Sequence, residues 1–257
     1  MKDIRQAEKV FNMHRFYVEG CSGLCDLIEI TGEDVNHIKN VLRLKTGDEI
    51  VISDGNGVDY ICNIESIGNT VTAKITDYNA NASELPTRII LFQGMPKSDK
   101  MEFIIQKAVE LGVYQIVPVM TSRTVVKIEP KKVEKKLQRY NSIAMSAAKQ
   151  SCRGIIPEVK EFMTFKQAVK YACEQTDMSI IPYEEAEGIK YSRSVIKSVK
   201  GNIAVGIFIG PEGGFAKEEI DFAIENNFKC ITLGNRILRT ETAGLAVISI
   251  IMFEIEE

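Results

Sequence analysis

The stretch NIAVGIFIGPEGGF at residues 202–215 joins an apolar run to a glycine-rich turn. The stretch CITLGNRILRTETA at residues 230–243 follows the same plan, because an apolar run again ends in a glycine. A third apolar run, SIIPY, covers residues 179–183. Ligands of open α/β sheets bind beyond the carboxyl ends of the strands. The three places where these runs end are therefore the candidate binding loops.

The remainder of residues 85–257 agrees with this interpretation, because strand-like apolar runs alternate with helical patterns. Such alternation predicts an α/β fold with a mostly parallel sheet covered by helices on both faces. The predicted strands are 88–93, 115–120, 179–183, 202–210 and 230–234, and the predicted helices are 98–111, 131–149, 165–175, 189–199, 216–226 and 241–255.

Residues 1–84 have a different pattern, typical of a small β-barrel. Four strand-like runs occupy 16–18, 49–53, 58–66 and 70–78, and one short helix is predicted at 33–42. The sequence Asp-Gly-Asn-Gly at 54–57 predicts a hairpin turn between two of the strands. Because the pattern changes near residues 83–86, we expect two domains, 1–84 and 85–257.

Neither glycine-containing loop identifies a ligand by itself. Glycine lets a backbone approach a ligand closely, but GPEGG also suits a plain turn from strand to helix. The chain has no GxxxxGK[ST] and no GxGxxG, which disfavours a P-loop or a Rossmann dinucleotide site. In the other loop, Ile237 and Leu238 can wall an adenine pocket. The alternative is a helix start capped by Thr240 or Thr242.

Composition places the chain among ordinary globular proteins, with 45% hydrophobic and 26% charged residues in 257. No apolar run approaches the roughly 20 residues that span a bilayer, and the charged start does not resemble a secretion signal. We therefore expect a cytoplasmic protein that does not interact with a membrane. The cysteines are expected to be reduced, and with only two histidines and an unmatched Cys21–Cys25 pair no metal is expected.

Positive charge is concentrated in the middle of the chain. Residues 85–160 have a charge balance of +8, whereas residues 1–84 have −6 and residues 161–257 have −5. A basic stripe on an acidic protein suits a polyanion such as RNA, although a solvated helix face has the same composition. The basic residues of this stripe are Arg123, Lys127, Lys131, Lys132, Lys135, Lys136 and Arg139.

In combination, the two loop motifs decide between these readings. IGPEGGF followed by LGNRILRTETA resembles the signature of the RsmE family, the SPOUT-class methyltransferases that act on N3 of a uridine in 16S ribosomal RNA. The resemblance extends to MHRFYV at 13–18, HIKNVLRLKTGDEI at 37–50, QKAVELGV at 106–113 and SAAKQSCRGIIPEV at 146–159. Lys149 departs from the acidic residue common there in the family. Residues 1–12 precede the usual start, as an added extension or a variable tail.

The resemblance implies a fold and a cofactor. Residues 1–84 would form a PUA-like, RNA-binding β-barrel, and residues 85–257 a SPOUT domain with a trefoil knot. The protein would be a homodimer that acts on 16S ribosomal RNA or the small ribosomal subunit. S-adenosylmethionine would lie in the three strand-end loops, against Ile181, Pro182, Ile209, Gly210, Pro211, Gly213, Leu233, Gly234, Arg236, Ile237, Leu238, Arg239 and Ala243.

Catalysis would depend on arginines, because a guanidinium can stabilise negative charge that develops on the uracil ring. The predicted catalytic residues are Arg153, Arg15 and Arg239. Glu241 is a possible base, or else belongs to the helix start. The predicted RNA-binding residues are Arg15, Arg43, Lys45, Arg123, Lys131, Lys132 and Arg153.

Three other functions stay open on the sequence. A SPOUT enzyme can instead methylate a ribose 2′-hydroxyl. A protein with this fold can also be a non-catalytic RNA-binding assembly factor. GPEGG could belong to a phosphate- or nucleotide-binding protein, although the lysine and serine of a P-loop are missing.

Overall fold

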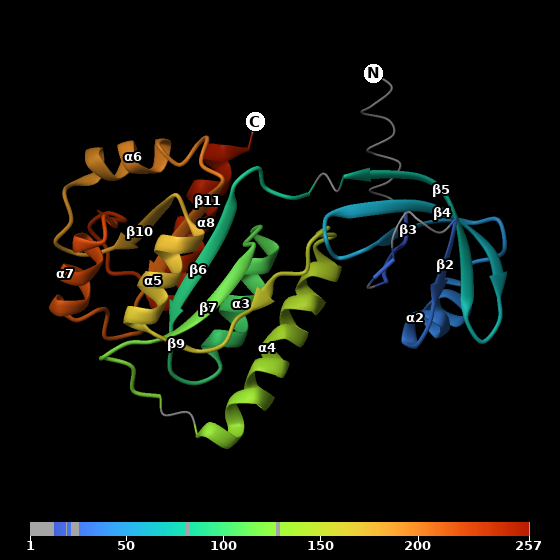
Figure 1. Cartoon of the computed structure of the whole chain (residues 1–257), viewed down its shortest axis with the longest axis horizontal. Helices are drawn as coiled ribbons and strands as arrows, with labels where there is room; N and C mark the ends of the chain where they lie inside the picture. Colours follow the sequence, from blue (N-terminus) through green and yellow to red (C-terminus); the bar gives the residue numbers. More distant parts are fainter. Residues whose placement is uncertain (1–12, 19, 22–25, 81–82, 127–128, 257) are drawn as a thin grey trace. The chain divides into compact units, whose positions relative to one another are not determined.

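The computed structural model describes residues 13–18, 20–21, 26–80, 83–126 and 129–256. The chain forms two compact units, one of residues 1–84 with 149–156 and the other of residues 85–148 with 157–257 (Figure 1). The sequence had placed 149–156 with the second domain. The structure differs there, because this segment returns to the first unit and bonds to it.

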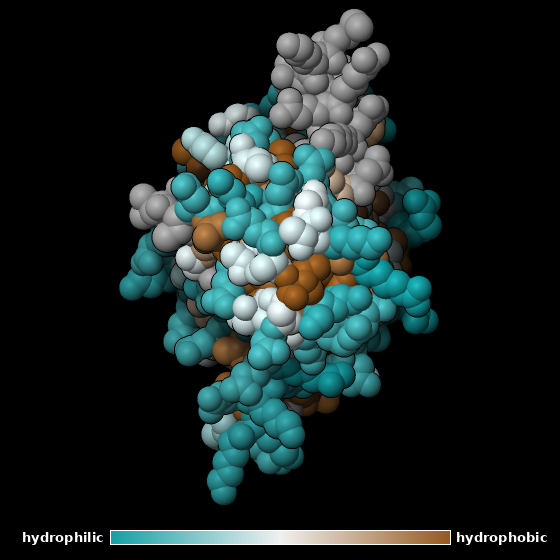
Figure 2. Space-filling view, turned by 90° about the vertical axis from the view of Figure 1, so that its right-hand side faces the viewer, coloured by the Kyte–Doolittle hydropathy of each residue, from teal (hydrophilic) through white to brown (hydrophobic). Residues whose placement is uncertain are grey.

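The first unit is built on a five-stranded sheet in the order β1-β3-β4-β5-β2. Strands β1 and β3 are parallel and the other neighbours are antiparallel. Its elements are β1 (Arg15–Tyr17), β2 (Leu27–Ile30), helix α2 (Glu33–Asn36), the π-helical turn η1 (His37–Leu42), β3 (Glu49–Ser53), β4 (Val58–Ile67) and β5 (Val71–Ala80). The predicted hairpin is confirmed, since the Asp54 carboxylate accepts the backbone N–H groups of Asn56 and Val58. Figure 2 shows the face on the right of Figure 1, where hydrophilic side chains surround small apolar patches.

Glu84 fastens the returning segment to the first unit. Its carboxylate pairs with both ends of the Arg153 guanidinium at 2.9 and 2.7 Å. It also accepts the backbone N–H groups of Gly154 and Ile155. The Tyr17 hydroxyl donates to the Arg153 carbonyl, and burial raises the pKa of this hydroxyl so that it stays protonated. Residues 149–156 are thus part of the first unit, although they continue directly from the end of helix α4 in the chain.

The second unit contains a parallel sheet in the order β12-β10-β11-β6-β7-β8, with β9 also paired to β7. Its strands are β6 (Arg88–Gly94), β7 (Gln115–Met120), β8 (Glu158–Val159), β9 (Met163–Thr164), β10 (Met178–Pro182), β11 (Ala204–Ile209) and β12 (Lys229–Ile231). The helices are α3 (Lys100–Glu110), α4 (Pro130–Gln150), α5 (Phe165–Gln175), α6 (Ile189–Lys197), α7 (Lys217–Glu225) and α8 (Thr240–Ile255). The predicted α/β pattern is confirmed, and the two-residue strands β8 and β9 were not predicted.

Helices cover both faces of this sheet (Figure 1). On one face, α5 and α7 pack on an aromatic cluster in which the Phe92 and Phe208 rings stack 4.2 Å apart. On the other face, α8 packs against β11 and β6 and touches α3 and α6. Gly244 of α8 lies against Ile209 and Leu91, where a Cβ would be in ordinary contact. Because α8 follows β12 at one edge of the sheet, the chain must cross the ends of β10 and β11 to reach this position.

The Arg153–Glu84 pair leads to a prediction about stability. Arg153→Ala removes a side chain that is only 3% exposed and leaves a partly buried carboxylate without its cation. We expect a loss of about 3 kcal/mol in the free energy of unfolding of the first unit. The control is Arg139→Ala, which breaks a pair with Glu102 whose arginine is 66% exposed and should cost about 1 kcal/mol or less. Denaturant titration measures both, and equal losses would contradict the assignment.

Candidate functional site

The strand order brings the three predicted loops together. Strands β12, β10 and β11 are neighbours and run parallel, so their carboxyl ends share one edge of the sheet. Pro182 pairs with Ile231, and the Tyr183 N–H continues this ladder to the Ile231 carbonyl at 2.9 Å. Segments from residues 183, 210 and 232 onward therefore leave the sheet side by side.

The GPEGG loop is closely packed at its start, beside the end of β6. A Cβ on Gly94, at the end of β6, would come within 2.7 Å of the Pro211 ring and backbone nitrogen. A Cβ on Gly210 would lie 3.0 Å from Gly214, because the loop folds back on itself. Gly214 has φ of +66°, a conformation that glycine adopts without strain. The glycines fix a tight loop at the end of β11.

The Glu212 side chain ties this loop to the segment after β6. Its carboxylate accepts the Lys97 backbone N–H and pairs with Lys100 at 3.1 Å. Burial alone would raise the pKa of Glu212, but the hydrogen bonds from backbone N–H groups and Lys100 outweigh it, so the pKa lies below its ordinary value. Lys100 also pairs with Glu241 at 3.2 Å. This contact favours the structural alternative for Glu241 over the role of base.

Thr240 joins three parts of the edge. Its hydroxyl donates to the Gly210 carbonyl at 2.6 Å and accepts from the Gln93 side-chain amide at 2.9 Å. Both Thr240 and Gln93 are buried. The bridge connects the end of β6, the GPEGG loop and the first turn of α8. The cap prediction was wrong, because in the described chain no side-chain hydrogen bond caps α8, whose N-cap residue is Arg239.

The predicted cofactor residues differ in exposure. Ile181, Ile209 and Pro211 are buried and shape the edge from below. Arg236, Ile237 and Arg239 are exposed, and Ile237 is 86% exposed although it is apolar. Gly213 is also exposed, and the half-buried members are Pro182, Gly210, Leu233, Gly234, Leu238 and Ala243. Loops with open glycines and an exposed apolar side chain fit a ligand with a flat apolar ring.

The predicted arginines lie in different environments. Arg15 pairs with Asp59 in the first unit, where both side chains are largely buried. Arg153 pairs with Glu84, so its placement supports a structural role, and its contact with RNA stays a prediction. Arg239 is exposed at the start of α8. Arg123 is exposed and donates to the Gly213 carbonyl at 2.8 Å, beside GPEGG.

The remaining predicted RNA contacts are on the surface. Arg43 and Lys45 are exposed on the first unit, and Arg43 has a left-handed φ of 55°. Lys131 and Lys132 are exposed at the start of α4, where Lys132 pairs with Glu129 at 3.0 Å. Lys127 lies outside the described residues. These positions leave the amino and guanidinium groups of Arg43, Lys45 and Lys131 at the surface.

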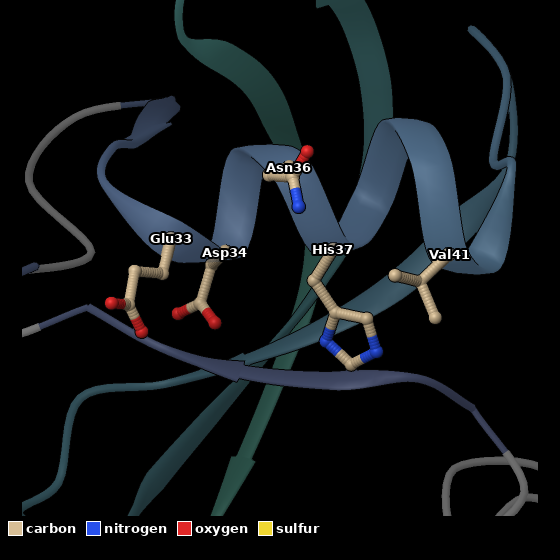
Figure 3. Close-up of a pocket in the computed structure, with 5 residues that line it drawn as sticks. All are labelled: Glu33, Asp34, Asn36, His37 and Val41. Carbon is tan, nitrogen blue, oxygen red and sulfur yellow. The ribbon is translucent and has the colours of Figure 1, made fainter.

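A pocket in the first unit is lined by Glu33, Asp34, Asn36, His37 and Val41, all from α2 and η1 (Figure 3). Two carboxylates at its rim do not suit a phosphate group. Across the part of the chain that the structure describes, no three His, Cys, Asp or Glu side chains are grouped to hold a metal ion. The described cysteines, at 21, 62, 152, 173 and 230, are free thiols, and Cys25 lies outside the described residues.

Comparison with known proteins identifies the family. Residues 83–252 match the family model for the RNA methyltransferase domain, and residues 30–76 match that for the RNA methyltransferase PUA domain. The chain belongs to the RNA methyltransferase family. It is 34% identical to ribosomal RNA small subunit methyltransferase E of Bacillus subtilis, over 95% of this chain and 98% of that protein.

A solved structure agrees with this assignment. Ribosomal RNA small subunit methyltransferase E of Neisseria gonorrhoeae, bound to S-adenosyl methionine, is 31% identical. The similarity covers 93% of this chain and 96% of that one, with a TM-score of 0.78. The comparisons confirm the predicted family, the methyltransferase class and the PUA-like first domain.

The Thr240 bridge leads to a prediction about cofactor binding. Thr240→Val keeps the shape of the side chain but removes the donor to the Gly210 carbonyl and leaves the Gln93 amide with only its bond to the Gly94 carbonyl. We expect S-adenosylmethionine to bind about tenfold more weakly, equivalent to about 1.4 kcal/mol, because the loop that receives it loses two hydrogen bonds that hold it in place. Isothermal titration calorimetry measures the affinity, and Thr240→Ser should restore most of it.

The matched control is Thr242→Val, because Thr242 is exposed two residues further along α8. It should bind the cofactor as the unmodified protein does. If Thr240→Val lowers the melting temperature but leaves the cofactor affinity unchanged, Thr240 supports only the fold.

Proposed function

We propose that this protein transfers the methyl group of S-adenosylmethionine to N3 of a uridine in 16S ribosomal RNA. The observation that carries the proposal is the placement of the three loops beyond β10, β11 and β12 at one edge of a parallel sheet. Family membership and the cofactor named for the Neisseria relative support the reaction class. The uridine N3 target comes from the resemblance to the RsmE family.

The loops fit this cofactor. Leu233, Ile237 and Leu238 supply apolar surface for an adenine ring, and the glycines at 210, 213 and 234 leave backbone groups accessible. The full proposed set is Ile181, Pro182, Ile209, Gly210, Pro211, Gly213, Leu233, Gly234, Arg236, Ile237, Leu238, Arg239 and Ala243. S-adenosylmethionine supplies a methyl group that its sulfonium already makes electrophilic.

The protein then has to orient the acceptor base and stabilise its charge. Uridine N3 lies on the Watson–Crick edge, so the base must be unpaired or flipped toward the loops. Loss of the N3 proton leaves negative charge on the uracil ring, and a guanidinium stabilises this charge until N3 takes up the methyl group and the ring is neutral again. Of the three predicted catalytic arginines, Arg239 is exposed beside the loops, whereas Arg15 and Arg153 are paired with carboxylates. We therefore place Arg239 first.

RNA attraction is proposed to come from the basic middle of the chain. Lys131 and Lys132 on α4 and Arg123 beside GPEGG are exposed within the second unit. Arg43 and Lys45 provide local positive charge on the otherwise acidic first unit. Such contacts position an RNA backbone without reading its sequence.

We further propose a homodimer formed through α8. This helix is apolar along most of its length, yet Phe253 is 83% exposed and Ile250 is 47% exposed. Exposed large apolar side chains that adjoin each other indicate an interaction surface. In a twofold-symmetric dimer the same helix from a second copy would cover them.

Two other expectations remain proposals. The trefoil knot is supported by the crossing of residues 232–240 over the sheet edge, where Thr240 meets the Gly210 loop. A cytoplasmic location follows from a ribosomal RNA substrate. No helix among the described residues is both long and apolar enough to cross a membrane.

Mapping the methylated atom tests the reaction. Unmodified 16S ribosomal RNA, free or assembled into the small subunit, is incubated with protein and S-adenosylmethionine, then digested and examined by mass spectrometry. We expect one methyl group on the base of one uridine, at N3. A ribose 2′-O-methyl group would favour the alternative SPOUT activity. Cofactor binding without transfer to either substrate would favour a non-catalytic assembly factor.

The proposed dimer predicts the effect of a charge on α8. Phe253→Glu should convert the dimer to a monomer, because an ionised carboxylate cannot be buried unpaired in an apolar interface. Size-exclusion chromatography with light scattering measures the mass. Ile224→Glu is the control, since Ile224 is 52% exposed on α7 and should leave the dimer intact. A monomeric unmodified protein, or a dimeric Phe253→Glu variant, would contradict this interface.

A further inference from the structure

Arg123 occupies a place that its sequence context does not reveal. It lies in the turn after β7, which the Thr121 and Thr124 hydroxyls hold closed. In the sheet β7 is separated from β11 by β6. The Arg123 side chain nevertheless reaches the GPEGG loop that follows β11, and its Nη1 donates to the Gly213 carbonyl at 2.8 Å.

The contact between the two loops is close and has a second attachment. A Cβ on Gly213 would lie 3.4 Å from the Arg123 Cβ and 3.6 Å from its Cδ, so the arginine side chain runs along the surface of the loop. The neighbouring Ser122 N–H donates to the Glu219 carboxylate of α7 at 2.9 Å. The turn after β7 is therefore fixed against both ends of the segment that contains GPEGG.

Several arginines have a carboxylate partner that balances their charge, and in the described part of the chain Arg123 does not. Arg139, for example, pairs with Glu102, and Arg153 pairs with Glu84. Within the described ranges, no carboxylate forms an ion pair with Arg123, and its one hydrogen-bond acceptor is a neutral carbonyl. A guanidinium has five N–H donors in a fixed plane. One contact to Gly213 leaves several donors on an exposed side chain.

We propose that Arg123 is a positioning residue that joins the RNA to the cofactor loop. One edge of its guanidinium holds the Gly213 carbonyl, and the outward edge binds a phosphate beside the target uridine. This proposal rests on the proposed function and adds to it a physical link between the two substrates. Because one rigid group bonds both, RNA binding holds the GPEGG loop in place for S-adenosylmethionine. By reciprocity, the cofactor strengthens RNA binding by the same factor.

The proposed contact with both the Gly213 carbonyl and a phosphate requires the planar, several-donor guanidinium of arginine and not only a positive charge. Lysine presents a compact ammonium at the end of a flexible chain and cannot match the planar two-sided geometry of arginine. Arg123→Lys should therefore keep the attraction for phosphate and lose the coupling. Arg123→Ala should lose both.

The experiment measures the affinity for S-adenosylmethionine with and without unmodified 16S ribosomal RNA, by calorimetry. In the unmodified protein we expect RNA to tighten cofactor binding by about fivefold or more. In Arg123→Ala and Arg123→Lys the two affinities should become equal, while affinity without RNA changes by less than about threefold. The RNA affinity of Arg123→Lys should keep its salt dependence, and that of Arg123→Ala should lose about one phosphate contact from the slope. Turnover should fall in both variants.

The matched control is Arg193→Ala, an exposed arginine on α6 in the same unit, which should retain the coupling. Coupling that survives in Arg123→Ala, or is absent from a protein that methylates the RNA, overturns the role of Arg123 and leaves the proposed function standing. Equal losses in Arg193→Ala would also overturn it, because they would show a general charge effect. A protein that neither binds the cofactor nor transfers methyl groups overturns the proposed function itself.

Discussion

The Thr240 hydroxyl, held between the Gly210 carbonyl and the Gln93 amide, organises the carboxyl edge of the second unit. The chain leaves β12 at one border of the sheet and has to pass the ends of β10 and β11 before α8 can pack beneath β11 and β6. The buried Thr240 hydroxyl, which donates to Gly210 and accepts from Gln93, fixes the point at which this crossing segment ends and α8 begins. Without it, the Gly210 carbonyl would lose this donor and the Gln93 amide would keep only its bond to the Gly94 carbonyl. A buried polar group left without a partner costs about 1–3 kcal/mol.

The surrounding loops depend on the same crossing. Lys100 pairs with Glu212 of GPEGG and with Glu241 in the first turn of α8. These ion pairs near the surface join the same loop and helix that Thr240 joins in the interior. Gly94 and Gly210 allow the strands and the loop to approach closely enough for these bonds to form. These bonds hold the base of each loop in place. The exposed parts of the loops, such as Ile237 and Gly213, stay available to a ligand. Rigid support beneath exposed loops is what precise alignment of a methyl group requires.

Sequence reasoning found the elements whose signals are local. Helix α5 occupies the predicted residues, 165–175, because its apolar periodicity is strong and Thr164 forms a capping box with Gln167. Strands β8 and β9 were missed because two residues carry no period. The return of 149–156 to the first unit was missed for another reason. Glu84 forms its hydrogen bonds to this segment across about 70 positions, and no local pattern in the sequence predicts such a distant contact. The three strand-end loops were predicted because each follows an apolar strand, and the strand order puts them at one edge of the sheet.

Roles of single side chains were harder to predict. Thr240 looked like a cap, because a threonine before a helix usually is one, and its true partners lie 30 and 147 positions away. The sequence gives no sign that Arg15 and Arg153 have carboxylate partners. Only the fold shows that they pair with Asp59 and Glu84. Arg123 was grouped with a basic stripe, and only the fold shows its bond to Gly213.

Hydrogen exchange of the backbone amides, followed by mass spectrometry with and without S-adenosylmethionine, tests the central claim that one frame holds three loops around the cofactor. We expect added protection in 182–188, 210–214 and 232–240 together, with little change in 26–80. Protection confined to one of these segments, or centred on the pocket of Glu33, Asp34 and His37 in the first unit, would contradict it.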